Sequence, residues 1–176
     1  MAYHRRVYPR LVFIVTHLIP LLRYRLAKDV VSAIAYAGAR KLADKHPDLA
    51  VAVVTVHLTH GTPPGVFVMP TLTNQSVKGC GAYIPGNKDI LISQAIVEAM
   101  EKSTDGKKTI KLMAEVFVIL IHELAHYLNY TYGHGKELED KVKDEWGVDL
   151  GTKLTEHLWD YTGCIEGELK SMGVKW

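Results

Sequence analysis

The feature that most constrains the fold is an apolar run in the second half of the chain. Residues 116–121 read VFVILI, and the surrounding stretch, residues 109–129, contains neither Pro nor Gly. Its length and composition predict a long helix, and the apolar residues of its middle lie on every side of that helix. Because such a helix has no face suited to water, we expect it at the centre of the domain.

The remaining pattern predicts further helices and a small mixed sheet around this central helix. Strands are expected where β-branched residues gather, and helices where apolar residues recur at helical spacing. The expected helices cover residues 23–46, 94–102 and the region from 136 onward, the expected strands cover 50–58, 66–69 and 89–93, and 130–135 is an expected loop. An N-terminal helix, then strands, then helices is typical of an α+β fold.

Length and composition fit one domain over residues 1–176, with residues 1–22 as an N-terminal extension. Hydrophobic residues make up 48% of the 176 residues, which is enough for a single core. The apolar run at residues 11–22 is shorter than the roughly 20 residues that span a bilayer, so we expect it to pack on the domain without an integral membrane span. No signal-peptide cleavage site follows it, and Cys80 and Cys164 are too few for a disulfide framework. These features predict a cytoplasmic protein.

The central helix ends in a motif with metal-binding spacing, His122-Glu123-Leu124-Ala125-His126. Residues four apart lie on one face of a helix, so both imidazoles can reach one metal ion. Glu123 is rotated by about 100° around the axis and can contact a water molecule beside the metal. Zinc in catalytic sites takes such donors and keeps a position open for water. We predict Zn²⁺ held by His122 and His126, with Glu123 as the catalytic base.

The third zinc ligand has two candidates. A common spacing would place a histidine at position 132, where this chain has Tyr132. His134 follows in the expected loop, between two glycines, and could fold back to the metal. Glu145 lies on the next expected helix, with Asp149 one turn later. A carboxylate ligand accompanied by a second carboxylate that orients a histidine is also a coherent zinc site.

The segment 122–137, HELAHYLNYTYGHGKE, resembles the core of SprT-like metallopeptidases, the group that includes Spartan proteases. In that family a third histidine follows in an HGxE-aromatic motif, and residues 134–138 match it with Leu138 in place of the aromatic residue. The resemblance covers about residues 70–150. It implies a zincin-like fold and His134 as the third zinc ligand. The chain departs from the family in having no C-terminal zinc ribbon, which two cysteines could not form.

A rival resemblance is to gluzincins such as thermolysin, in which a downstream Glu is the third ligand and an Asp follows four residues later. Glu145 and Asp149 fit that pattern. This resemblance implies a peptidase without a link to nucleic acids. A zinc-binding interaction protein without catalysis is a third hypothesis, and Glu123 argues against it because a structural zinc site needs no base.

The SprT-like resemblance implies protein or peptide substrates on or near DNA. The net charge of only +2, from 21 Lys+Arg and 19 Asp+Glu, argues against strong nucleic-acid binding. We therefore expect at most weak, sequence-independent DNA binding, which salt would weaken further. Two basic clusters are the expected contacts: His4, Arg5, Arg6 and Arg10, and Lys107, Lys108 and Lys111.

Two further expectations concern how the substrate is held. In zincins an extended substrate usually pairs with the edge strand of the sheet, and residues 89–93 or the segment before them are the candidate edge. The oxyanion formed during hydrolysis needs a hydrogen-bond donor. Tyr127, Tyr130 and Tyr132 are the candidate donors, because they follow the metal motif closely in the sequence. Tyr130 and Tyr132 lie in the expected loop.

Overall fold

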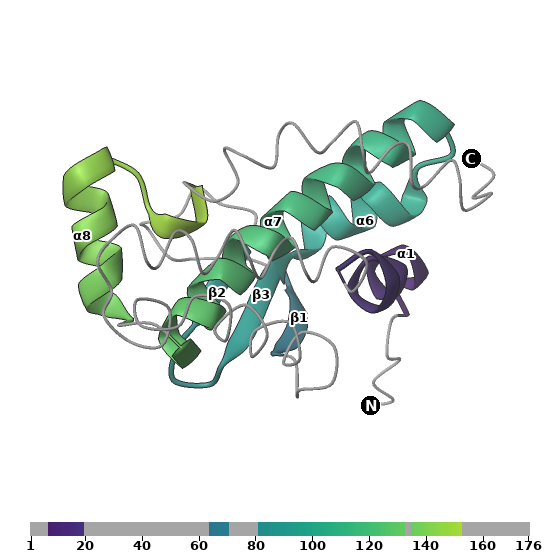
Figure 1. The fold of residues 1–176 in the computed structure, drawn as a ribbon. Helices are drawn as coiled ribbons and strands as arrows, with labels where there is room; N and C mark the ends of the chain where they lie inside the picture. Colours follow the sequence, from purple (N-terminus) through teal and green to yellow (C-terminus); the bar gives the residue numbers. More distant parts are fainter. Residues whose placement is uncertain (1–6, 20–63, 71–80, 133–134, 153–176) are drawn as a thin grey trace.

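The computed structural model of the chain describes residues 7–19, 64–70, 81–132 and 135–152. The expected helix over 23–46, the expected strand over 50–58, both cysteines and His134 lie outside these residues. The described elements are α1 (Pro9–Phe13), η1 (Ile14–Leu18), β1 (Gly65–Met69), β2 (Gly81–Ile84), β3 (Asp89–Ser93), α6 (Gln94–Lys102), α7 (Gly106–Tyr132) and α8 (Lys136–Trp146). Helices combined with a small mixed sheet confirm the α+β prediction (Figure 1).

Helix α7 is the centre of the described fold. It is 27 residues long and crosses the molecule above the strands, with α6 beside its first half (Figure 1). Five of the six residues of its apolar run are buried, with Val116, Phe117 and Ile121 at 0% exposure, and Ile119 is partly buried. The helix is longer than expected at both ends. Asp105 accepts a hydrogen bond from the backbone N of Lys108 at 2.8 Å, as an N-terminal cap does.

The three described strands lie in the order β1-β3-β2, with β1 parallel and β2 antiparallel to β3. The expectation that Asp89–Ser93 is an edge strand is therefore wrong, because β3 pairs on both sides. The segment before it, β2, lies at one edge of the described sheet. It also packs against α7, so this edge of the sheet lies beside the helix that carries the metal motif.

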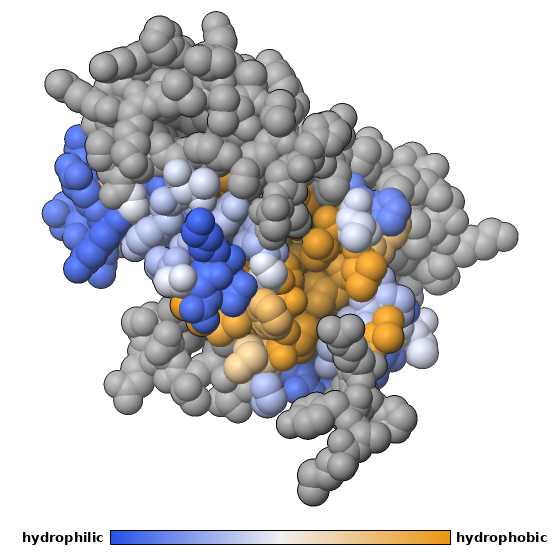
Figure 2. Space-filling model, turned by 90° about the horizontal axis from the view of Figure 1, so that it is seen from below, coloured by the Kyte–Doolittle hydropathy of each residue, from blue (hydrophilic) through white to orange (hydrophobic). Residues whose placement is uncertain are grey.

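The register assigns the side chains of the sheet to two faces. One face packs against the core under α7 and carries Val66, Val68, Gly81, Tyr83, Ile90 and Ile92. On the other face, Phe67 and Met69 are 52% and 37% exposed. Figure 2, seen from below, shows apolar residues gathered near the middle of this face of the molecule and the hydrophilic residues of α8 at the left. Gly81 and Tyr83 therefore both face α7.

The N-terminal segment packs on the body of the domain, as expected from its sequence. Leu11, Ile14 and Leu18 are buried in the same core as α6 and α7. Within the described part of the chain, no helix has both the length and the apolarity needed to cross a membrane.

Arg10 and Glu101 join α1 to α6 by capping one another's helices. The Glu101 Oε1 atom accepts hydrogen bonds from the backbone N of Arg10 at 2.8 Å and of Leu11 at 3.0 Å. In return, Arg10 Nη1 donates to the carbonyl oxygens of Met100, Glu101 and Ser103. Carbonyls at the end of a helix lack intrahelical partners, and a cationic side chain satisfies them. The Arg10 side chain is therefore engaged within the molecule and is not a free basic contact.

Replacing Arg10 by Ala is expected to lower the free energy of unfolding by about 1–3 kcal/mol, because half-buried carbonyls lose a charged donor. Chemical denaturation measures this. Lys102→Ala is the control, since Lys102 is 75% exposed and pairs with Glu98 along the same helix. Its expected effect is below about 0.5 kcal/mol. Equal effects of the two substitutions would contradict the capping role.

Candidate metal centre and active site

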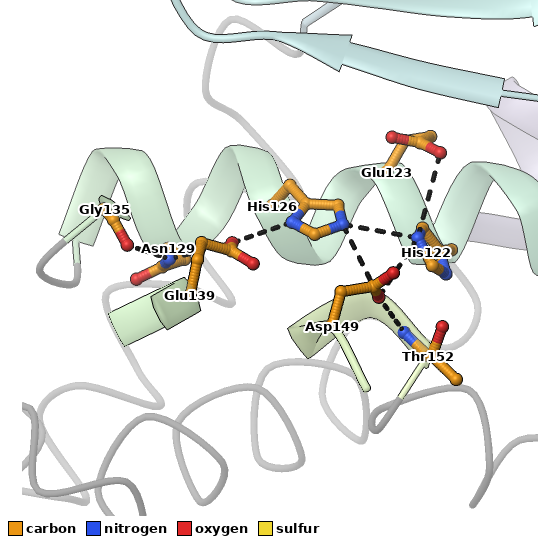
Figure 3. Close-up of polar contacts among 8 residues, drawn as sticks. All are labelled: His122, Glu123, His126, Asn129, Gly135, Glu139, Asp149 and Thr152. Carbon is orange, nitrogen blue, oxygen red and sulfur yellow. Dashed lines mark hydrogen bonds and ion pairs between the residues drawn. The ribbon is translucent and has the colours of Figure 1, made fainter. Parts of the chain in front are cut away.

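His122 and His126 project from α7 toward Asp149, which follows α8 in the chain (Figure 3). The Nε2 atoms of the two histidines are 3.3 Å apart. Asp149 Oδ1 lies 3.5 Å from Nε2 of His122 and 3.9 Å from Nε2 of His126. Among the described residues, these three form a group whose ligand atoms could hold one metal ion.

The spacing of these three atoms fits a small tetrahedral cation. Ligands bound to zinc at about 2.0 Å in a tetrahedron lie about 3.3 Å from one another. The observed separations of 3.3, 3.5 and 3.9 Å are close to this value. Two imidazole nitrogens and one carboxylate are also a donor set that catalytic zinc sites use, with the fourth position left for water. The residues present therefore fit a metal.

The backbone after α8 brings Asp149 to the histidines. Gly147 ends α8 in the left-handed conformation, with φ 71°, which a glycine adopts at low cost. Asp149 Oδ1 then accepts a hydrogen bond from the backbone N of Thr152 at 2.7 Å, as the N-cap of the helical residues that follow it. Burial raises the pKa of Asp149, but this bond and the two histidines outweigh it and lower the pKa. The side chain stays ionised, as a metal ligand must.

Gly151 lets this segment pack directly on His122. A Cβ atom at position 151 would lie 2.5 Å from Cδ2 and 2.6 Å from Nε2 of His122. Any larger residue would displace either the imidazole or the segment that carries Asp149. The requirement for glycine is thus steric, and it keeps the ring and the carboxylate together.

Glu139, on α8, orients His126 from the side opposite the metal group. Its Oε1 lies 2.7 Å from His126 Nδ1 and accepts a second hydrogen bond, at 3.1 Å, from Nδ2 of buried Asn129. Asn129 also donates to the carbonyl of Gly135 at 2.9 Å, which fixes the start of α8. With Nδ1 donating to Glu139, the Nε2 lone pair of His126 faces Asp149 and is available for a metal.

The two histidines differ in their proton affinity because of these partners. Burial lowers the pKa of His122, and the charge of Asp149 does not offset it. Burial also lowers the pKa of His126, but the hydrogen bond and the charge of Glu139 outweigh it and raise the pKa. Sequence reasoning did not identify Glu139. The sequence feature that could have indicated Glu139 is its position next to Leu138, at the border of the buried stripe of α8.

Replacing Glu139 by Gln is expected to weaken zinc binding by about 10–100-fold, the usual cost of losing a carboxylate that orients a metal-binding histidine. Competition with a chromophoric chelator measures the affinity. Asp140→Asn removes the same charge from the adjacent, exposed position of α8 and should leave the affinity unchanged. If both variants bind zinc as the wild type does, Glu139 does not position His126.

Glu123 lies on the side of α7 that faces the strands (Figure 3). Its carboxylate is 4.0 Å from His122 Nε2 and accepts a hydrogen bond from the backbone of Tyr83. The side chain is 7% exposed, and burial raises its pKa to about 7. A carboxylate with this pKa can accept a proton at neutral pH and release it again. Glu123 is therefore suited to act as a general base beside the metal group.

Gly81 makes room for this base. A Cβ atom at position 81 would lie 2.6 Å from Cγ2 of Ile119 and 3.0 Å from Oε1 of Glu123. Because position 81 has no side chain, β2 approaches α7 closely enough for its backbone to bond to Glu123.

Three other candidate residues have these positions in the structure. Glu145 does not join the group of His122, His126 and Asp149; its side chain is 42% exposed and its Oε1 is 4.0 Å from Nζ of Lys141. Tyr130 and Tyr132 belong to α7, so their placement in a loop is wrong.

Residues 4–159 match the family model described as metallopeptidase toxin 3 (Tox-MPTase3). The chain belongs to this metallopeptidase family. No curated protein and no solved structure is significantly similar to it. Membership of the metallopeptidase toxin 3 family confirms the prediction of a metallopeptidase and implies a metal, which the group of His122, His126 and Asp149 could hold. The narrower resemblance to SprT-like peptidases stays a prediction.

Proposed function

We propose that this chain is a zinc-dependent peptidase that hydrolyses peptide bonds in protein substrates. His122, His126 and Asp149 are the proposed zinc ligands, with Glu123 as the base; His134, which the SprT-like resemblance favours, is the alternative third ligand. The observation that carries the proposal is the near-tetrahedral spacing of three ligand atoms, with a buried carboxylate 4.0 Å from one of them. The family of the chain supports it.

The proposed reaction is hydrolysis assisted by a general base. Bound zinc would polarise the substrate carbonyl and lower the pKa of a water molecule. Glu123 accepts a proton from the attacking water as its oxygen bonds to the carbonyl carbon. It then gives that proton to the amine as the carbon–nitrogen bond breaks. Glu139 holds His126 in the tautomer that a metal requires.

The substrate is proposed to lie along β2, the strand beside Glu123. An extended peptide can add to the edge of a sheet through backbone hydrogen bonds. At an edge strand that contacts Glu123, this would bring a peptide bond close to the base. The family is described as a metallopeptidase toxin. For this chain we accordingly propose an activity that is toxic to the cell in which it acts.

The association with DNA that the SprT-like resemblance implies also stays a prediction. Lys107, Lys108 and Lys111 are exposed at the start of α7 and remain the candidate contact. Arg10 is less suited, because it caps α6.

Removing the metal tests the proposed function. The purified protein is expected to contain about one zinc ion per chain and to cleave a casein or peptide-library substrate. A chelator should abolish cleavage, and added Zn²⁺ should restore it where Mg²⁺ does not, because nitrogen donors favour zinc. Metal analysis and cleavage assays measure this. Cleavage that continues in the metal-free protein, or folded protein that binds no zinc, would refute the proposal.

A further inference from the structure

Three tyrosines gather on the side of α7 that carries Glu123. Tyr127 and Tyr130 follow Glu123 by four and seven residues, which places them on the same helix face. Tyr83 reaches them from β2, with ring centroids 6.0 Å from Tyr127 and 5.7 Å from Tyr130. Tyr83 is also the residue whose backbone bonds to Glu123. The aromatic cluster is therefore continuous with the proposed catalytic base.

The cluster packs on a buried tyrosine and is partly open to solvent. Tyr127 is 4% exposed and forms its base, with the Tyr83 ring packed edge-on against it. Tyr83 is half-buried, whereas Tyr130 is 39% exposed. The backbone of Gly135 lies against the Tyr130 ring, since a Cβ atom at 135 would be 3.2 Å from its Cδ1. Rings that are already held in place bind a ligand with little further loss of conformational entropy.

The cluster lies within reach of a substrate positioned at Glu123. At about 1.5 Å per residue along a helix, Tyr127 and Tyr130 are roughly 6 and 10 Å beyond Glu123. An extended peptide advances about 3.3 Å per residue. A substrate residue two or three positions from the cleaved bond would therefore meet the half-buried ring of Tyr83 and the exposed ring of Tyr130.

We infer that Tyr83 and Tyr130 form a specificity subsite for an aromatic or large aliphatic substrate side chain near the cleaved bond. This inference rests on the proposed function and adds the substrate class to it. Aromatic pairs in offset or edge-to-face contact, together with the apolar area they bury, give the preference. Phe, Tyr, Trp, Leu and Met are the side chains that fit this chemistry.

Peptide cleavage tests the subsite directly. A peptide library cleaved by the zinc-loaded protein identifies the preferred position, and two peptides that differ only by Phe or Ala there are then compared. The wild type is expected to prefer Phe by about 10-fold or more in kcat/KM, as apolar pockets usually do. Tyr130→Ala should bring the ratio close to one, and Tyr130→Phe should keep it. Tyr83→Leu, which retains an apolar side chain for folding, should reduce the ratio. Phe67→Ala, on the opposite face of the sheet, should leave it unchanged.

Binding measured without catalysis separates the subsite from the reaction. In the zinc-loaded Glu123→Gln protein, calorimetry should find the Phe peptide bound more tightly than the Ala peptide, and adding Tyr130→Ala should remove the difference. If the wild type cleaves peptides without this preference, or Tyr130→Ala keeps it, the subsite is wrong and the peptidase stands. If nothing is cleaved, the proposed function fails, and equal binding of both peptides then also rejects the subsite.

Discussion

Glu123→Gln is expected to slow peptide hydrolysis by more than about 100-fold, the usual loss when a general base is removed. Glutamine has nearly the same shape and can still accept the hydrogen bond from the Tyr83 backbone, but it cannot take a proton from water. Glu123 lies outside the group of His122, His126 and Asp149, so the variant should keep its zinc. The measurements are kcat with a fluorogenic peptide and zinc content per chain.

Glu115→Gln is the matched control, because Glu115 lies on the same helix two turns before Glu123. It should cleave and bind zinc as the wild type does.

Expression of the wild type should slow the growth of a host cell, and Glu123→Gln should relieve this if the toxicity is catalytic. Hydrolysis by Glu123→Gln at the wild-type rate would mean that another group activates the water.

The same substitution is expected to slow hydrolysis but to stabilise the metal-free protein against unfolding. Burial raises the pKa of Glu123 from 4.5 to about 7, so the folded state binds its proton more tightly than the unfolded state does. Ionised Glu123 therefore opposes folding above pH 7, and this cost disappears as the pH falls toward 4.5. Metal-free Glu123→Gln should be more stable than the wild type at pH 8, by up to about 3 kcal/mol. A gain at pH 8 that does not shrink on acidification would contradict the assigned burial effect.

The elements that were predicted correctly from the sequence are those whose residues are compatible with only one arrangement. The run VFVILI is apolar on every side of the helix, and in α7 five of its six residues are buried and Ile119 is partly buried. The pair His122 and His126 meets because helical spacing alone brings the two rings together. The β-branched residues of Asp89–Ser93 correctly predicted a strand. Such a composition indicates a strand but not its number of neighbours, so the central place of β3 was not predictable from it.

The carboxylate partners were harder to identify, because residues 136–149 contain many acidic side chains. To choose among these acidic residues, one has to know how α8 is rotated about its axis and at what angle it leaves α7. Gly135 and Gly147, with φ of 58° and 71°, determine the chain direction at its two ends. As a result, Glu139 reaches His126, and Asp149 reaches both histidines from beyond the helix. The sequence had suggested Asp149 only as a residue that orients a histidine.

Asp149→Asn is expected to weaken zinc binding by more than about 100-fold, beyond the usual effect of a residue that only orients a ligand. Asparagine is also a good N-cap, so the bond from the Thr152 backbone and the local fold should persist. What the variant loses is the negative charge opposite His122 and His126. Zinc content after dialysis and competition with a chelator measure the affinity, and thermal unfolding of the metal-free protein checks the fold.

Glu145→Gln and His134→Ala complete this comparison, since each removes one of the other candidate ligands. Glu145 is half exposed beside Lys141, so its variant should bind zinc as the wild type does. If Glu145→Gln loses zinc while Asp149→Asn keeps it, the gluzincin-like ligand set is correct and Asp149 only orients a histidine. If His134→Ala alone loses zinc, the SprT-like set is correct. Cobalt substitution adds a spectroscopic test: loss of a direct ligand should change the visible spectrum of the bound Co²⁺, whereas loss of an exposed carboxylate on α8 should not.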